Sequence, residues 1–565
     1  MVVDTPREPA GLPPPRWVSP SLEVKRGQDP LGLQTTTIDQ LMPRLLPGIL
    51  ELSQRARYFS FYAYLLDLYR ERHGAAVPAA LSDFIKAREW EYGLAVLHCP
   101  HDCGSVPVGA VKLRAVTGHQ DPPYPRGFSV QSDFGGFGLY YRSPLSDMAI
   151  VARSGTPLGD TPIPIDVLYP TPRARHLADT FRDAVDGTAY VKTWMFRSDP
   201  IPLDVLVEYA SVACLCQLKE RDDERDAVYD AFFGTDDDLL SESDEQLESV
   251  VADIDSTMPE SEDVRHRTAR VRQRRASVAH YLTLVQANPD IVDDSSAYRE
   301  AFWAPPSSRS ALHELVAGEW AGLVAKDIWQ DALCSIWSEF CRSGLAANRA
   351  GGDDGLSWSQ TQDLARAMVN GPPSLDPDQR SVDLVTRIVT GDVTLPDITP
   401  DLPSMPMESL RVATAHLDTA TSGLVVLLEL HRRVCTRADS GWVRATTLRS
   451  PWQPSLASVL QAISSHLETN ATVADTLWWI VDNFILTVHE RIAYSKLPEH
   501  TFRFRWENGR VRFYNNGIGR FPLASIRQDP LASLTNDIGF WDRDPKGRPA
   551  RLTPRGSAFI DEVLS

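Results

Sequence analysis

The sequence has few cysteines and no segment typical of a secreted or membrane-spanning chain. Seven cysteines among 565 residues are an odd and small number, which does not support a disulfide framework. The first residues, MVVDTPREPAGLPPPRW, lack the charged and then apolar build of a signal peptide. No apolar run approaches the roughly 18 residues that would indicate a membrane helix. We therefore expect a cytoplasmic protein in a reducing compartment that does not contact a membrane.

Recognisable catalytic motifs are also missing. The chain contains no Gly-x-Ser-x-Gly nucleophile turn and no phosphate-binding Gly-x-x-x-x-Gly-Lys-Ser/Thr loop, and DFGGFG at 133–138 lacks both the lysine and a following helix. The two Glu/Gln-x-Lys matches, at 23–25 and 217–219, lie in a proline-rich arm and on a predicted helix rather than on neighbouring strands, as a metal-dependent nuclease would require. These absences favour a protein without intrinsic catalytic activity, and they indicate no catalytic residue and no cofactor.

One short segment contains residue types that bind metals. His98, Cys99, His101 and Cys103 lie close together in the sequence, but a zinc site usually needs a second pair of ligands. Cys214 and Cys216 lie on an apolar stretch, which favours a core position for them. The sequence therefore predicts a helix end with a polar turn at 98–104 and no metal site.

The chain is acidic overall and long enough for several domains. It has 57 basic and 75 acidic residues, a formal net charge of −18, with 43% hydrophobic residues that can form sizeable cores. An average surface of this charge repels nucleic acid, so any nucleic-acid site must be a local concentration of basic residues.

Hydrophobic spacing predicts a mainly α, multidomain protein of irregular helical domains, with a C-terminal α+β module. The apolar stretch 49–69 predicts a helix that is buried on every side. Residues 235–264 carry twelve acidic residues and no basic one, and six arginines follow at 265–275, either as the start of a solvated helix or as a binding segment. The expected domains are a proline-rich extended arm at 1–33, an N-terminal helical domain at 34–234 with a loop-rich insert at 122–172, an acidic linker at 235–264, a helical domain at 265–497, and a basic hairpin with a winged-helix-like module at 498–565.

The C-terminal segment begins with a β-hairpin signal. TFRFRWENGRVRFY alternates aromatic or apolar residues with arginines on both sides of Asn508-Gly509, a pair that favours a two-residue turn because both of its positions need positive φ. After it, a helical stretch, a polar loop, Leu552-Thr553-x-x-Gly556 and a final helix resemble the wing and closing helix of winged-helix DNA-binding proteins. That resemblance implies DNA binding.

Basic residues concentrate in this segment. Twelve basic and six acidic residues lie between Lys496 and Arg555, which gives a local charge of +6. Their side chains could bind phosphates, the main source of nucleic-acid affinity, or they could form salt bridges with the acidic remainder of the protein. The predicted nucleic-acid-binding residues are Arg503, Arg505, Arg510, Arg512, Arg527, Arg543, Lys546 and Arg548.

The N-terminal helical segment carries a family resemblance. Leu46-Pro47-Gly48, then RARYFSF at 55–61 and Arg88-Glu89, resemble a group of uncharacterised bacterial proteins encoded in phage-defence islands beside helicases, ATPases or nucleases. The ending HERIAYSKLPEHTFRFRWENGRVRFY is similar to the ends of some of them. The resemblance implies genomic context and protein partners, but no catalytic residues. An arginine next to an apolar helix is costly to bury unless it is paired, so we expect Arg55 and Arg57 to anchor the helix through carboxylates or carbonyls.

Three functions fit these observations. The favoured one is a non-catalytic subunit of an antiphage defence or restriction assembly, which bridges protein partners and contacts DNA through the C-terminal module. A divergent metal-dependent nuclease effector and a DNA-binding regulator with a helical sensor domain are the alternatives.

Overall fold

The computed structural model divides the chain into two compact units, each built from separate stretches of sequence. The first unit comprises Met1–Leu41 and Asp294–Ala524, and the second comprises Met42–Asp293 and Ser525–Ser565. The described residues are 29–73, 78–156, 162–234, 264–305, 307–352, 354–370, 373–395, 402–415, 419–435, 456–497, 501–514, 522–544 and 546–565.

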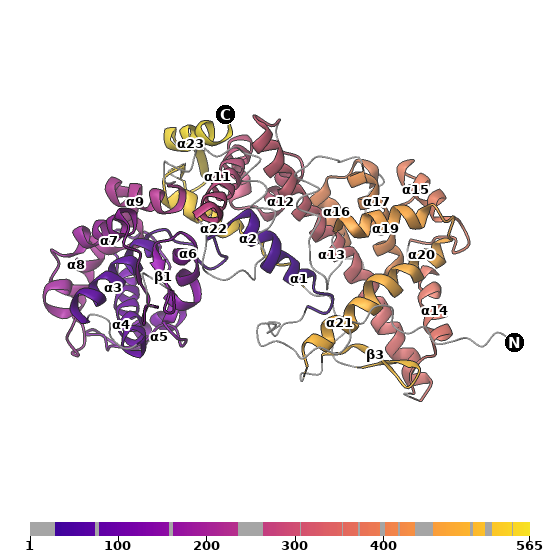
Figure 1. Ribbon diagram of the computed structural model, residues 1–565, viewed down its shortest axis with the longest axis horizontal. Coiled ribbons are helices and arrows are strands. Elements are labelled where there is room, and N and C mark those ends of the chain that lie inside the picture. Colours follow the sequence, from indigo (N-terminus) through magenta and orange to yellow (C-terminus); the bar gives the residue numbers. More distant parts are fainter. Residues whose placement is uncertain are drawn as a thin grey trace. The chain divides into compact units, whose positions relative to one another are not determined.

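The second unit is largely helical (Figure 1). Two small antiparallel hairpins lie within it: β1 (Val151–Ala152) pairs with β2 (Val167–Leu168), and β5 (Trp541–Arg543) pairs with β6 (Pro549–Leu552). Its α-helices are α2 (Met42–Leu45), α3 (Arg57–His73), α4 (Pro78–Leu97), α5 (Ala110–His119), α6 (Arg142–Asp147), α7 (Pro172–Val185), α8 (Leu203–Ala213), α9 (Asp222–Phe233), α11 (Val264–Ala287), α22 (Gln528–Asp537) and α23 (Pro554–Leu564), with π-helical η3 (Phe137–Tyr141) and η4 (Tyr190–Trp194) and 3-10 helices η5 (Leu215–Glu220) and η7 (Pro289–Val292).

Helix α3 is the centre of this unit. Every residue from Arg57 to Tyr69 is buried, as the apolar pattern on all sides of the helix predicts. It packs against α7, and α7 packs against α9, while α4 packs against α8. Aromatic rings fill the space around it; Phe61, for example, stacks on Tyr92 with 4.2 Å between ring centroids. The helix begins at Arg57 rather than at Ile49, so the predicted helical start was eight residues too early.

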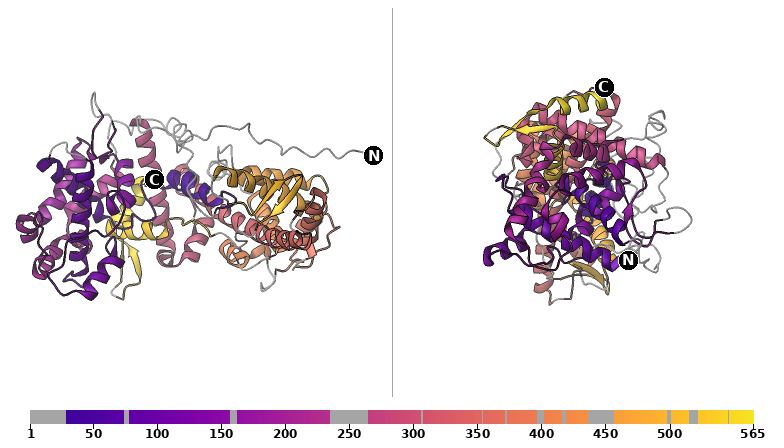
Figure 2. Two further views of the ribbon diagram at one scale, coloured as in Figure 1. Left: turned by 90° about the horizontal axis from the view of Figure 1, so that it is seen from below. Right: turned by 90° about the vertical axis from the view of Figure 1, so that its left-hand side faces the viewer.

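The C-terminal residues complete the same unit. Helix α23 packs against α11, and Figures 1 and 2 both show the yellow C-terminal segment beside the crimson α11. Thr553 caps α23 because its hydroxyl accepts a hydrogen bond from the Gly556 backbone N–H. The order helix, hairpin and closing helix over 528–564 agrees with the expected α+β module.

The first unit is built around one long helix, α13 (Ala311–Ala350), which packs against α12, α16 and α17. Ser357 and Gln360 form a reciprocal capping box at the start of α14. The other elements are α1 (Leu33–Thr35), α12 (Ser295–Trp303), α14 (Trp358–Ala367), α15 (Ser381–Val389), α16 (Met407–Ala415), α17 (Ala420–Cys435), α19 (Leu456–Leu467), α20 (Val473–Ile480), α21 (Thr487–Ser495), π-helical η2 (Thr36–Leu41) and η10 (Val481–Leu486), 3-10 helices η8 (Met368–Asn370) and η9 (Leu402–Ser404), and strands β3 (Phe504–Glu507) and β4 (Arg510–Phe513).

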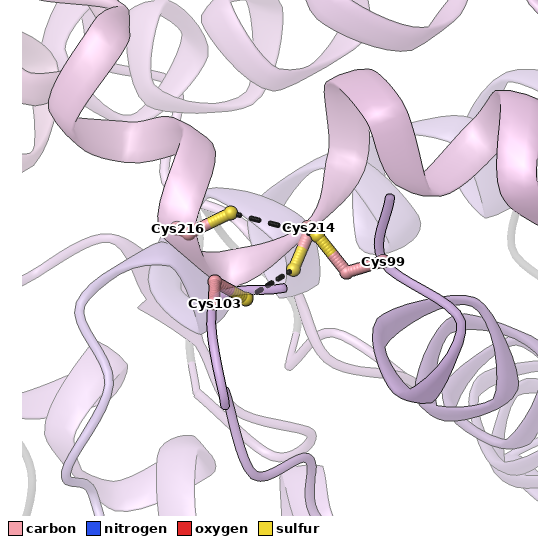
Figure 3. Close-up of side chains that lie close together, drawn as sticks. All are labelled: Cys99, Cys103, Cys214 and Cys216. Carbon is pink, nitrogen blue, oxygen red and sulfur yellow. Dashed lines mark hydrogen bonds between the residues drawn. The ribbon is translucent and has the colours of Figure 1, made fainter. Parts of the chain in front are cut away.

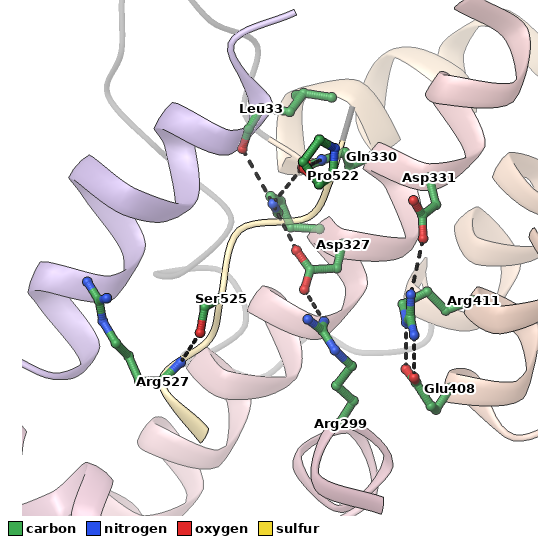
Figure 4. A network of polar contacts seen from close by, with 11 residues as sticks. Leu33, Arg299, Asp327, Gln330, Asp331, Glu408, Arg411, Pro522, Ser525 and Arg527 are labelled. Carbon is green, nitrogen blue, oxygen red and sulfur yellow. Dashed lines mark hydrogen bonds and ion pairs between the residues drawn. The ribbon is translucent and has the colours of Figure 1, made fainter. Parts of the chain in front are cut away.

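A buried polar network lies on α13 in the first unit (Figure 4). Asp327, whose side chain has no exposed surface, pairs with Arg299 of α12 and, at 2.9 Å, with Lys326 Nζ. Lys326 Nζ also donates to Gln330 Oε1 at 3.1 Å and to the Leu33 carbonyl at 3.4 Å. Gln330 Nε2 in turn donates to the Pro522 carbonyl at 3.1 Å. The network therefore connects the segment around Leu33 and the segment around Pro522 to α13, the central helix of this unit.

The predicted hairpin forms as β3 and β4 and packs on α13. Asn508 and Gly509 both have positive φ, 51° and 77°, as a two-residue turn of this kind requires. Phe504 and Phe513 lie opposite each other on the inner face and contact Phe340 of α13. A Cβ at Gly344 would lie 2.1 Å from the Phe513 ring, so only glycine lets the hairpin approach the helix this closely.

The structure confirms the predicted fold class, a mainly α multidomain protein with a C-terminal α+β module. Residues 498–565, which we expected to form one module, are shared between the units: the β3–β4 hairpin belongs to the first and the residues from Ser525 to the second. The proline-rich arm up to residue 28 and the acidic segment 235–263 lie outside the described residues. Among the helices that the structure describes, none is both long and apolar enough to cross a membrane.

Candidate functional site

The strongest candidate for ligand binding is the outer face of the β3–β4 hairpin, here called the arginine face, formed by Arg505, Glu507, Arg510 and Arg512. Strand alternation places these four residues opposite the buried phenylalanines. In the register of the two strands, Arg505 lies directly opposite Arg512, and Glu507 lies opposite Arg510. Three arginines and one glutamate leave this face with a formal charge of +2.

Residues of the hairpin already make hydrogen bonds to neighbouring segments along its edges. The outer face is therefore the part of the hairpin that is left for a ligand. The Trp506 N–H donates to Glu490 Oε1 of α21 at 2.8 Å, and Val511 exchanges two backbone hydrogen bonds with Leu356. Side chains on the outer face remain accessible: Arg505 is 37% exposed and Arg512 is 48% exposed. The guanidinium groups of these two arginines are therefore partly accessible without any displacement of the hairpin.

Glu507 partly compensates the two facing arginines. Its carboxylate oxygens lie 3.6 Å from Arg505 Nη1 and 3.9 Å from Arg512 Nη1. Arg505 also donates from Nε to the Tyr494 hydroxyl at 3.2 Å and lies over the Tyr494 ring, with 5.4 Å between its central carbon and the ring centroid. That hydrogen bond raises the pKa of Arg505, which stays fully charged. One carboxylate shared by two guanidinium groups leaves both with unused donors.

Arg503 has a different environment from the other three hairpin arginines. It is half-buried, and burial lowers the pKa of its side chain. Its backbone N–H donates to Nε2 of His489 at 2.9 Å. His489 is buried, and its Nδ1 lies 3.0 Å from the Pro30 carbonyl, so the neutral ring donates from Nδ1 and accepts at Nε2. This histidine links α21 to the hairpin and to the segment around Pro30.

We expect the first unit to lose stability as the pH falls, because burial lowers the pKa of His489 from 6.5 to about 3. Between these values the unfolded chain binds a proton at His489 that the folded unit cannot accept, so the free energy of unfolding should fall with decreasing pH, by up to about 1.4 kcal/mol per pH unit. Denaturant titrations at several pH values measure the slope. His489→Gln, which keeps an acceptor for Arg503 but does not titrate, should show a shallower slope; an unchanged slope would contradict the prediction.

Most of the other residues predicted to bind nucleic acid form ion pairs or hydrogen bonds within the second unit. Arg527 is buried, with Nη1 3.7 Å from Glu51. Arg543 makes two 2.8 Å hydrogen bonds to Asp293, and Arg548 makes a 2.8 Å ion pair with Asp544. Lys546 is exposed on the turn between β5 and β6. The β5–β6 hairpin is therefore largely neutralised, and its residues lie in a different unit from the arginine face.

The RARYFSF segment has a structural role that agrees with expectation. Arg57 is completely buried and makes a two-pronged contact with Glu224, at 3.0 Å from Nε and 2.8 Å from Nη2. Arg55 makes an equivalent contact with Asp537 of α22, at 2.9 and 3.1 Å. Arg274 of α11 is also held by the second unit, because its side chain donates to the carbonyls of Phe232 and Pro47. These arginines stabilise the second unit instead of presenting a binding surface.

The structure also brings together four cysteines that the sequence analysis assigned to separate features. The Sγ atoms of Cys99, Cys103, Cys214 and Cys216 all lie within 4.8 Å of one another (Figure 3). The second pair of ligands, which the sequence analysis did not identify, is thus supplied by a Cys-x-Cys that begins 111 residues after Cys103. The available sequence signal was that four of the seven cysteines occur as two close pairs; the apolar residues around the second pair obscured it.

No protein-family model, curated protein or solved structure matches the chain. The fold and the site define a mainly helical protein of two discontinuous units that carries a cationic hairpin face on the first and a four-cysteine cluster in the second.

Proposed function

We propose that this protein is a non-catalytic subunit of a bacterial antiphage defence or restriction assembly, which bridges protein partners and contacts DNA through the arginine face. The proposal retains the favoured function from the sequence and narrows its DNA contact from the whole C-terminal segment to one surface of the first unit.

The single observation that carries the DNA contact is the direct cross-strand pairing of Arg505 with Arg512. Like charges directly opposite each other destabilise a hairpin, and the nearby Glu507 offsets only part of this repulsion at 3.6 and 3.9 Å. An anionic ligand removes the repulsion, and guanidinium groups match phosphate oxygens well because each presents several donors in a plane. The nucleic-acid backbone is an anion whose successive phosphates can contact several such groups on one strand face.

The remainder of the proposal is supported by the sequence. The RARYFSF segment and its neighbours resemble proteins of phage-defence islands, which implies partners such as a helicase, an ATPase or a nuclease. Because the sequence contains no recognisable catalytic motif, the proposal assigns the chemistry to such a partner. A chain of net charge −18 also favours DNA binding at one local surface over binding along its whole length.

We expect DNA binding to depend on Arg505 and Arg512 and on salt. One phosphate contact for each of Arg505, Arg510 and Arg512 gives a slope of about −2.7 in log affinity against log salt. The affinity should therefore fall by about 40-fold between 50 and 200 mM salt. Arg505→Glu/Arg512→Glu should weaken binding at low salt and reduce the slope to about −0.9, because one contact remains. Fluorescence anisotropy of a labelled duplex with the full-length protein at both salt concentrations measures affinity and slope.

Lys546→Glu/Arg548→Glu is the matched control. It changes the net charge by the same amount on the β5–β6 hairpin of the second unit, so a general electrostatic effect should weaken binding equally in both variants. We expect this control to bind close to wild type. Wild-type affinity in the Arg505→Glu/Arg512→Glu variant would show that the arginine face is not the DNA site, and no measurable binding by the wild-type protein would contradict the DNA contact altogether.

The assembly is tested separately by affinity purification of the tagged protein from its native operon, with nuclease treatment before elution. Partners that remain bound after nuclease treatment support direct protein bridging. Recovery of the chain alone would contradict the proposed role as a subunit. Incubation of the purified chain with DNA, RNA or ATP and Mg²⁺ or Mn²⁺ should give no turnover; activity abolished by a single acid-to-alanine substitution would identify an enzyme.

A further inference from the structure

We propose that Cys99, Cys103, Cys214 and Cys216 bind one zinc ion. The ion would be a structural metal site within the second unit. This inference concerns the second unit only and is independent of the proposed DNA contact.

Two of the distances between sulfur atoms match those around a single tetrahedral metal ion, and all four sulfurs lie within 4.8 Å of one another. Cys99 Sγ lies 3.7 Å from Cys216 Sγ, and Cys103 Sγ lies 3.6 Å from Cys214 Sγ. Four thiolates at metal–sulfur bonds of about 2.3 Å in a tetrahedron lie about 3.8 Å apart. A disulfide would need about 2.05 Å between two sulfurs, and these four cysteines are free. An iron–sulfur cluster places several metal atoms among its ligands and would hold the sulfurs further apart.

The two halves of the site come from the ends of packed helices. Cys99 and Cys103 lie on the turn after α4, where Asp102 and Gly104 both adopt positive φ and so bend the chain tightly. Cys214 ends α8, and Cys216 lies in the first turn of η5. Helices α4 and α8 pack against each other, which brings the two turns together from positions far apart in the sequence.

Hydrogen bonds outside the cluster hold each half in place. Arg57 Nη1 donates to the Cys214 carbonyl at 2.5 Å, and the Tyr92 hydroxyl donates to the adjacent Ala213 carbonyl at 2.9 Å. His101 Nε2 lies 3.2 Å from the Ser211 carbonyl and ties the first turn to α8. Gln217 Nε2 donates to the Cys216 sulfur at 3.5 Å, a contact that suits a thiolate bound to metal.

The donor set determines the metal and its role. Thiolates are soft ligands that select zinc, copper(I) or iron over magnesium and calcium, and four of them in a tetrahedron are typical of structural zinc. Four protein ligands leave no position for water or substrate, so the ion would not be catalytic. The site joins the end of α4 to the α8–η5 junction, and we infer that zinc stabilises this corner of the second unit.

The test measures metal and thiols on the full-length protein as purified without chelator. Elemental analysis should give about one zinc per chain, and a mercurial reagent that titrates thiols should release that zinc as the cluster reacts. Cys99→Ser/Cys103→Ser should reduce zinc to background. Cys334→Ala, which changes a buried cysteine of the first unit outside the cluster, is the matched control and should retain full zinc.

Cobalt substitution keeps the proposal testable if the double variant does not fold. Wild-type protein exchanged with Co²⁺ should show the intense visible and near-ultraviolet absorption of tetrahedral cobalt bound by thiolates. Cys103→His should retain one metal ion with a shifted cobalt spectrum, because imidazole replaces one thiolate. Protein that holds no zinc and takes up no cobalt, or that holds iron in place of zinc, would overturn the assignment.

Discussion

Arg57→Ala is expected to lower the free energy of unfolding of the second unit by about 3–5 kcal/mol. The substitution leaves Glu224 buried with no exposed surface and without its two-pronged partner, and it removes the donor to the Cys214 carbonyl. A loss of this size is a large share of the roughly 5–15 kcal/mol that stabilises a folded protein. Denaturant titration gives the free energy, and hydrogen exchange should show the loss of protection in α3 and α9.

Two comparison variants distinguish the effect of leaving one buried charge unpaired from the effect of losing the ion pair or an arginine as such. Arg57→Met/Glu224→Leu replaces both partners by apolar side chains and should recover much of the lost stability, because no buried charge remains unpaired. Arg548→Ala removes an arginine whose side chain is 71% exposed and paired with Asp544, and it should change stability little. An Arg57→Ala protein with an unchanged melting temperature but no function would instead assign Arg57 to a binding site.

Asp327→Ala should destabilise the first unit by a similar amount, about 3–5 kcal/mol. Burial alone would raise the pKa of Asp327, but Lys326 and Arg299 outweigh it and lower the pKa, so the carboxylate is charged at neutral pH. Its removal leaves two cations facing each other in the core of the unit. Thermal or chemical denaturation checks the loss, and hydrogen exchange in α12 and α13 locates it.

A second substitution tests the cause. Lys326→Met in the Asp327→Ala background removes one of the two unpaired cations, so it should restore part of the stability, while Lys326→Met alone should destabilise. The difference between these effects is the interaction energy of the pair. Equal effects of Lys326→Met in both backgrounds would contradict an electrostatic origin for the loss.

Features that depend on neighbouring residues were predicted from the sequence. The Asn508-Gly509 turn is set by the conformational needs of a few consecutive residues, and it forms as expected. The burial of α3 on all sides follows from apolar residues on every face of one helix. Pairing of Arg55 and Arg57 followed from the cost of burying a charge, although the sequence could not identify Asp537 and Glu224 as the partners.

The arginine face was predicted in part. Strand alternation places Arg505, Arg510 and Arg512 on one side of the hairpin, and that part depends only on local sequence. Which of the basic residues face solvent depends on where acidic residues lie in the folded chain. Arg543 meets Asp293, 250 residues earlier, and this contact distinguishes it from the hairpin arginines.

By itself, the sequence determined the class of the fold, the burial of helix α3 on all sides and the turn of the basic hairpin, because these depend on the spacing and conformational preferences of residues close together in the chain. Tertiary structure alone decided the two discontinuous units and the meeting of Cys99 and Cys103 with Cys214 and Cys216. Those features arise when helices far apart in the sequence bury their apolar faces against each other, and local patterning contains no information about which distant faces will meet.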